Sequence, residues 1–256
     1  MSRRLSISLI ALLGAASCGP RGGTDVGNGA TVSFSLAEFM PGSVSSALSK
    51  PANTTLTLPS GDAVEEVWVA VEKISLQACE HPDDDGKSTF DGPIIVNLLA
   101  DDPPMGDAVT IAPGRYCKLG LALHEIQADE LPPGAPSDLA EVSLLMRGHR
   151  ADGVAFVVRS REPISLKLNA TKAGGFTLFG DNPLIIAFDL GAMEASLDLG
   201  SVDASPVLVD ADHEAKRLKA LEKVTKKTAA LFRDTNGDGV LSADEVGDEG
   251  ALAEGE

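Results

Sequence analysis

The chain has little of what most enzymes use to build an active site. Its 256 residues include one Trp, one Tyr, three Cys and four His. It contains no G-x-S-x-G elbow, no G-x-x-x-x-G-K-[ST] phosphate loop and no G-x-G-x-x-G after a strand. His124-Glu125 and His213-Glu214 begin like a zinc-protease helix, but both lack the second histidine of that motif. The sequence therefore predicts a protein without enzymatic activity.

Positive charge is also scarce. There are 21 Lys and Arg against 38 Asp and Glu, a formal net charge of −17. A chain of this balance does not attract nucleic acid through its overall field. The Lys-rich segment within 212–233 is an exception, and the surrounding negative charge favours a solvated helix face over a nucleic-acid site. No nucleic-acid partner is predicted.

Long apolar runs are absent after the N-terminal region, so no later segment is a transmembrane candidate. At the start, Met1 to Arg4 is basic, Leu5 to Leu13 is mostly apolar, and Gly14 to Cys18 is a small-residue region that ends in cysteine. This segment resembles a bacterial lipoprotein signal. The resemblance implies that residues 1–17 are removed, that Cys18 is acylated, and that residues 18–29 form a glycine-rich tether.

Lipidation at Cys18 would anchor the protein to a membrane in the cell envelope, on the periplasmic or outer-surface side. Ala15 stands where the family usually has Leu. Ordinary signal cleavage with secretion, or a retained helix, therefore stay as alternatives.

With Cys18 assigned to the lipid, Cys79 and Cys117 are left as a pair. Export places them in an oxidising compartment, where a structural disulfide is the default. Two buried free thiols are the alternative. A metal site is not favoured, because neither cysteine has another Cys or a second His at chelating spacing.

Residues 30–208 show the alternation and turn residues of a β domain. Short strands at this spacing predict an antiparallel β-sandwich, with no domain boundary inside it. The predicted strands are 31–36, 67–76, 94–99, 108–111, 116–123, 141–146, 154–158, 164–169, 184–189 and 196–199.

The patterns at 64–77, 94–102 and 112–123 are similar to a broad family of bacterial lipoproteins of unknown function. The resemblance implies a prealbumin-like or immunoglobulin-like sandwich and brings no catalytic residues. The remaining segment, 209–256, is predicted to hold an amphipathic helix at 212–233 followed by a loop.

That loop is the clearest chemical motif in the chain. The segment Asp234 to Glu245 matches the calcium loop D-x-[DN]-x-[DN]-G-x5-E, and Gly239 permits its sharp turn. It resembles the EF-hand family, with a short exit helix and no second loop. The resemblance implies Ca²⁺ held by all-oxygen ligands, one of them through water at Ser242. The ligand residues are Asp234, Asn236, Asp238, Val240 (backbone carbonyl), Ser242 and Glu245.

Two function classes follow. The first is a calcium-binding, non-enzymatic envelope lipoprotein that serves as a structural or binding module, with a protein or glycan ligand that the sequence does not name. The alternative is a glycan-directed envelope hydrolase with a site at one end of the sandwich. A cleft lined by converging carboxylates would favour the second class.

Overall fold

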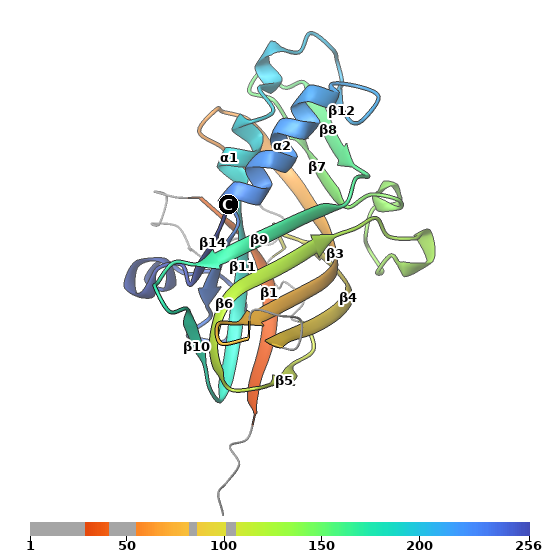
Figure 1. Cartoon of the computed structure of the whole chain (residues 1–256). Helices are drawn as coiled ribbons and strands as arrows, with labels where there is room; N and C mark the ends of the chain where they lie inside the picture. The colour runs from red at the N-terminus through yellow and green to blue at the C-terminus, as the bar shows by residue number, and fades with distance from the viewer. Residues whose placement is uncertain (1–28, 41–54, 82–85, 101–105) are drawn as a thin grey trace, which may run out of the picture.

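A computed structural model describes residues 29–40, 55–81, 86–100 and 106–256. The predicted signal, Cys18 and the predicted tether as far as residue 28 lie outside these residues. The described strands form one curled sheet, and two helices lie at its upper end in Figure 1. The chain is mainly β, as predicted.

In chain order the elements are β1 (Ala30–Phe39), β2 (Leu56–Thr57), β3 (Ala63–Ala78), β4 (Lys87–Asn97), β5 (Val109–Ile111), β6 (Gly114–Leu123), η2 (Ala128–Glu130), η3 (Ser137–Leu139), β7 (Leu144–His149), β8 (Ala155–Ser160), β9 (Ile164–Ala170), β10 (Phe176–Leu178), β11 (Asp181–Asp189), α1 (Leu190–Ala195), η4 (Leu199–Ser201), β12 (Val207–Val209), α2 (Ala215–Thr228), β13 (Ala230–Arg233), η5 (Glu245–Glu249) and β14 (Ala253–Gly255).

The sheet order is β12-β8-β7-β3-β6-β9-β14-β13-β11-β1-β5, with β10 on β6 and both β2 and β4 on β3. The long strand β3 pairs with β7 through its first half and with β6 through its second. The register shifts between Val71 and Lys73, just after β3 passes from β7 to β6. Such an irregularity bends a strand and increases its twist, which suits a curled sheet.

Two features differ from the predicted antiparallel sandwich. The described strands belong to a single sheet, so a sandwich of two sheets is not confirmed. The sheet is also mixed, because β1 runs parallel to β11 and β12 runs parallel to β8. Parallel neighbours need a long connection, so the two strands are far apart in the sequence. The alternation of apolar and polar residues along a strand does not indicate which distant strand lies beside it.

The main core fills the inside of the curl. Buried side chains from the strands pack there with Leu190 and Met193 of α1 and with Leu218 and Leu221 of α2. A second cluster covers the other face of β1, β11 and β13, and its members are Ala37, Ile185, Ala187, Ala230 and Phe232. We call this second group the outer cluster.

Two local predictions were wrong. Residues 196–199 form no strand: α1 ends at Ala195, and Leu197 and Leu199 are buried in the core without strand pairing. The predicted helix at 212–233 ends at Thr228, and 230–233 are β13. Leu231 faces the main core while its neighbours Ala230 and Phe232 face the outer cluster, so this segment is buried on both sides as an inner strand is.

Candidate functional site

The predicted calcium loop joins β13 to β14. Asp234 follows the last residue of β13, and its backbone N–H donates to Pro183 O at 3.0 Å. Leu241 and Val246 pack against the outer cluster. The loop is therefore docked on the outside of the sheet at both of its ends.

Asp234 and Glu245, the first and last residues of the loop, are 2% and 3% exposed. Asp234 Oδ1 accepts from Gly237 N at 2.6 Å, and Oδ2 accepts from Gly239 N at 2.8 Å. Gly237 and Gly239 have φ values of +74° and +75°, a region that favours glycine. The sharp turn expected at Gly239 is present.

Glu245 holds the two halves of the loop together. Its Oε1 accepts from Thr235 N at 2.7 Å, and its Oε2 accepts from Ser242 N at 2.8 Å and from Ser242 Oγ at 2.9 Å. Glu245 N donates back to Ser242 Oγ at 3.3 Å, which completes a reciprocal capping arrangement. Burial would raise the pKa of Glu245, but the hydrogen bonds from Ser242 and Thr235 outweigh burial and lower it.

Three of the four other predicted ligands face solvent. Asn236, Asp238 and Val240 are exposed, and Ser242 is half-buried. Asn236 Oδ1 accepts from Asp238 N at 2.9 Å, and Asp238 Oδ1 accepts from Val240 N at 2.8 Å. These bonds between residues two apart curl the chain tightly around the turn.

The donor set suits a hard cation, because each predicted ligand atom is an oxygen. The described residues nevertheless contain no group of three or more His, Cys, Asp or Glu that could hold a metal ion. The carboxylates of Asp234, Asp238 and Glu245 accept hydrogen bonds from backbone N–H groups instead. The residues thus fit Ca²⁺ in chemistry, and they would have to turn toward one another to hold it.

The flanks of the loop depart from a helix-loop-helix unit. A strand, β13, leads into the loop, and a single turn of π-helix, η5, leads out of it toward β14. β13 and β14 are antiparallel neighbours. The loop is therefore a connection between two paired strands of the main sheet.

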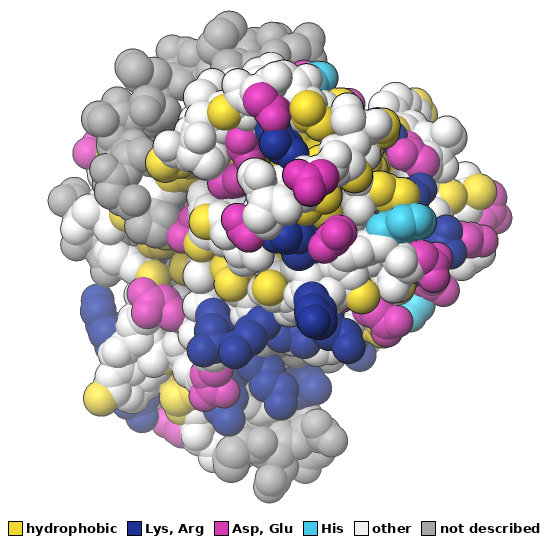
Figure 2. All heavy atoms as spheres, turned by 90° about the horizontal axis from the view of Figure 1, so that it is seen from above, with side chains coloured by type: hydrophobic (Ala, Val, Ile, Leu, Met, Phe, Trp, Pro, Cys, Tyr) yellow, Lys and Arg dark blue, Asp and Glu magenta, His cyan; other side chains and the backbone are white. Residues whose placement is uncertain are grey.

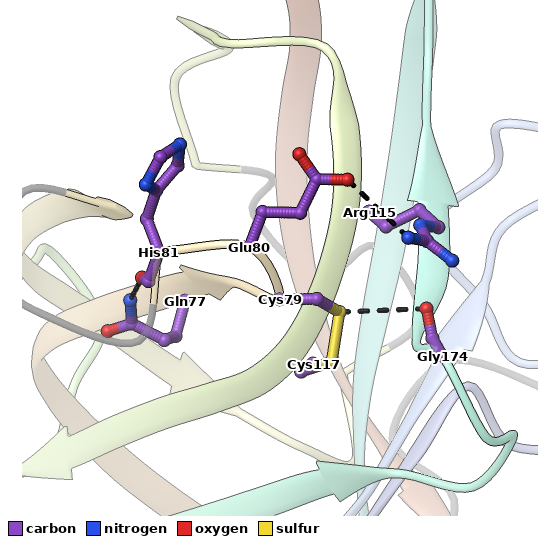
Figure 3. Close-up of a disulfide and its surroundings, with 7 residues drawn as sticks. All are labelled: Gln77, Cys79, Glu80, His81, Arg115, Cys117 and Gly174. Carbon is purple, nitrogen blue, oxygen red and sulfur yellow. Dashed lines mark hydrogen bonds and ion pairs between the residues drawn. A yellow bond between two sulfur atoms is a disulfide. The ribbon is translucent and has the colours of Figure 1, made fainter.

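The Cys79–Cys117 disulfide is confirmed. Cys79 follows β3, Cys117 lies on β6, and their Cα atoms are 4.9 Å apart. Figure 3 shows the bridge beside Gly174, whose carbonyl oxygen is 3.6 Å from Cys79 Sγ. A disulfide sulfur has no proton to donate, so this is a contact rather than a hydrogen bond. An ion pair between Arg115 and Glu80, at 3.4 Å, lies next to it.

Sequence reasoning missed a cleft of about 500 Å³ beside α1. Its volume is in the range of small-molecule sites. It is lined by the turn before β3, the β7–β8 turn and the segment from α1 to η4, and the lining residues are Pro59, Ser60, Asp62, Arg150, Ala151, Asp152, Gly191, Glu194, Ala195, Asp198, Leu199 and Gly200.

Two buried acids lie in the wall of this cleft. Glu194 is 4% exposed and Asp62 is 7% exposed. Their carboxyl groups hydrogen-bond to each other, which requires one of the two to carry a proton. Asp62 Oδ1 also accepts from Ala151 N at 2.8 Å. No sequence signal could have paired these residues, because only the curl of the sheet brings the turn before β3 against α1.

Comparisons with protein-family models, with curated proteins and with solved structures find no match. In the described part of the chain, no helix has the length and hydrophobicity needed to cross a membrane.

Proposed function

We propose that this chain is a calcium-binding, non-enzymatic module of the cell envelope, anchored to a membrane through a lipid on Cys18. The observation that carries the proposal is the Asp234 to Glu245 loop, which combines the calcium-loop spacing with buried acids at both ends. Asp234, Asn236, Asp238, Ser242 and Glu245 would offer side-chain oxygens, and Val240 its carbonyl.

The role of the ion in this proposal is structural. Bound Ca²⁺ would supply a positive charge that offsets the repulsion among the loop carboxylates. The strand after the loop, β14, lies between β13 and β9 and makes only short pairings with each. A loop held rigid at one end of β14 favours the pairing of β14 with its neighbours, because less chain entropy is then lost when β14 pairs.

A single calcium loop without a partner loop is typical of weak extracellular sites, with dissociation constants of about 10⁻⁴ to 10⁻³ M. Calorimetric titration of the chelator-treated full chain with Ca²⁺ at millimolar concentration tests the proposal. One ion per chain is expected. An absence of binding heat at that concentration would reduce the loop to an acidic turn.

Placement in the envelope is supported by the disulfide, since stable disulfides belong to oxidising compartments. Lipidation at Cys18 is tested by fractionation in a bacterial host. The native chain should stay with membranes until detergent is added, and Cys18→Ser should release it. An unmodified cysteine at the mature N-terminus, detected by mass spectrometry, would contradict anchoring and leave the secreted alternative.

The cleft is the observation that speaks for the alternative, a glycan-directed hydrolase. Glycosidases hold their two carboxyl groups about 5 to 9.5 Å apart, so that a sugar and in some cases a water fit between them. Asp62 and Glu194 hydrogen-bond directly to each other. We therefore prefer the non-enzymatic function. If the protein released reducing sugar from envelope glycans, and if Glu194→Gln abolished that activity, the hydrolase would be the better proposal.

A further inference from the structure

Lysines are concentrated on one side of α2. Seen from above, several blue side chains gather in one patch of the surface (Figure 2). Leu218, Leu221 and Thr225 face inward and are buried. At about 100° per residue, five lysines fall within an arc of about 100° on the opposite side. We call them the lysine stripe: Lys216, Lys219, Lys223 and Lys227, which are exposed, and Lys226, which is half-buried.

The stripe lacks acidic partners. Within the described ranges none of the five lysines forms an ion pair, whereas Arg217 beside them is bound by Glu214 and Asp198. Glu222, also on α2, accepts a hydrogen bond from Ser160 Oγ at 3.1 Å. Two exposed acids are Glu254 in β14, which packs against α2, and Glu256 directly after β14, and neither forms an ion pair with the stripe.

The stripe is unfavourable for the helix itself. Lysines three and four residues apart repel each other, at a cost of about 0.2 to 0.5 kcal/mol per pair. Gln has a similar helix propensity without the charge. The helix dipole favours Lys226 and Lys227, which lie in the last turn of α2, but not the three lysines before them. An external anion is a partner that the charge of the whole stripe complements.

The chemistry of the stripe narrows the class of anion. It contains no aromatic side chain on which a nucleobase could stack. Its cations are ammonium groups rather than the guanidinium forks that bind phosphate in a bidentate manner. The net charge of −17 opposes a long, densely charged nucleic acid.

The placement of the stripe argues against a membrane surface. In Figure 1, β1 begins at the lower end of the molecule and α2 lies at the upper end. A lipid on Cys18, upstream of β1, would thus hold the molecule by the end opposite the stripe. This step rests on the proposed function, and the remaining steps do not.

We propose that the lysine stripe binds an anionic polysaccharide, a linear glycan with one carboxylate per repeating unit. Neighbouring stripe positions are about 5 to 6 Å apart at Cβ, and the stripe from Lys216 to Lys227 is about 16 Å long. A short run of sugar carboxylates can lie along this row, each facing an ammonium group.

Oligomers of galacturonate serve as the probe, and their methyl esters are the uncharged control. The galacturonate oligomers are titrated into the full chain carrying Cys18→Ser, and the heat of binding is measured by calorimetry. The buffer contains a calcium chelator, and the titration is run at low and at physiological salt concentration. The variant with Lys216, Lys219, Lys223 and Lys227 all changed to Gln should lose about tenfold or more in affinity and much of the salt dependence. The matched variant, with exposed Lys73, Lys87, Lys118 and Lys172 changed to Gln, should stay within about twofold.

Equal losses in the two variants would mean a diffuse charge effect and would overturn the proposal, as would the absence of galacturonate binding. Stronger stripe-dependent binding to phosphatidylglycerol vesicles or to single-stranded DNA would overturn it in favour of those partners. Far-UV circular dichroism checks that both variants are folded. The calcium titration is run separately on the same proteins, so failure of one proposal does not decide the other.

Discussion

Glu194 of α1 hydrogen-bonds to Asp62, carboxyl to carboxyl, in the wall of the cleft beside α1. Two acids in contact cannot both be ionised without strong repulsion. Asp62 Oδ1 also accepts a hydrogen bond from Ala151 N at 2.8 Å. Burial raises the pKa of Glu194, which places the proton of the pair on Glu194. The pair joins the turn before β3, the β7–β8 turn and α1 as long as that proton is present.

This pair predicts a pH dependence of stability. Burial, followed by the contact with Asp62, raises the pKa of Glu194 from 4.5 to about 7, and Ser60 opposes the rise. The unfolded chain loses this proton near its ordinary pKa, so the free energy of unfolding falls as the pH rises through the interval between the two values. Glu194→Gln should remove this slope and raise stability at about pH 8 by up to about 3 kcal/mol.

Urea unfolding at about pH 5 and about pH 8 measures the effect. Exposed Glu162→Gln is the control, and it should leave the slope unchanged. A slope that persists in Glu194→Gln would show that the pair carries no shared proton.

Calcium binding should depend on the buried end of the loop. Glu245→Gln removes one charge from a carboxylate that is 3% exposed, whereas Asp244→Asn removes one charge from an exposed side chain. We expect the first to weaken Ca²⁺ binding by more than tenfold and the second by less than about threefold. Similar losses in calorimetry would mean that the loop attracts the ion only through its overall charge.

Chelation should act on β14 before the rest of the sheet. Hydrogen exchange in Ala253 to Gly255 is expected to speed up when Ca²⁺ is removed, because these residues follow the loop and form short pairings. Exchange in β3, which is paired along most of its length, should not change. Equal protection of β14 with and without the ion would contradict a structural role.

Loss of the disulfide should be costly. Cys79 and Cys117 are 38 residues apart, and the chain-entropy model gives about 4 kcal/mol for closing such a loop. The double change to Ala should lower the free energy of unfolding by an amount of this order. Peptide mapping without reduction should find the two cysteines linked, and alkylation of both in the native protein would contradict the bridge.

Gly174 and Gly175 offer a matched pair next to that bridge. Both have positive φ, +93° and +84°, so alanine is strained at each position. A Cβ on Gly175 would also lie 2.4 Å from Tyr116 O and 2.5 Å from Cys79 Sγ, while one on Gly174 meets its nearest neighbour, Arg115 Nη1, at 3.4 Å. Gly175→Ala should therefore lower the midpoint of thermal unfolding clearly more than Gly174→Ala. Equal effects would mean that backbone strain at positive φ, and not the close contacts of the added Cβ, causes the loss of stability.

Local physics explains what could be predicted. Alternation of apolar residues identified β3, β6, β9 and β11, because each has one face or more against the core. The disulfide was predicted from two cysteines left over in a chain whose first residues resemble an export signal. The calcium-loop pattern and its glycine turn are set by residues close in sequence, so the turn at Gly239 was predictable.

What the sequence by itself determined is the β class, the cysteine pair and the loop, since each depends on neighbouring residues or on simple counting. Tertiary structure alone decided the parallel pairings of β1 with β11 and of β12 with β8 and the position of β14 between β13 and β9. It also decided that residues 230–233 form a strand and not the end of the predicted helix. The contact between Asp62 and Glu194 belongs to the same group. The reason is that the hydrophobic pattern of a strand shows which face is buried, whereas the strand that pairs with its edge depends on the arrangement of the whole sheet.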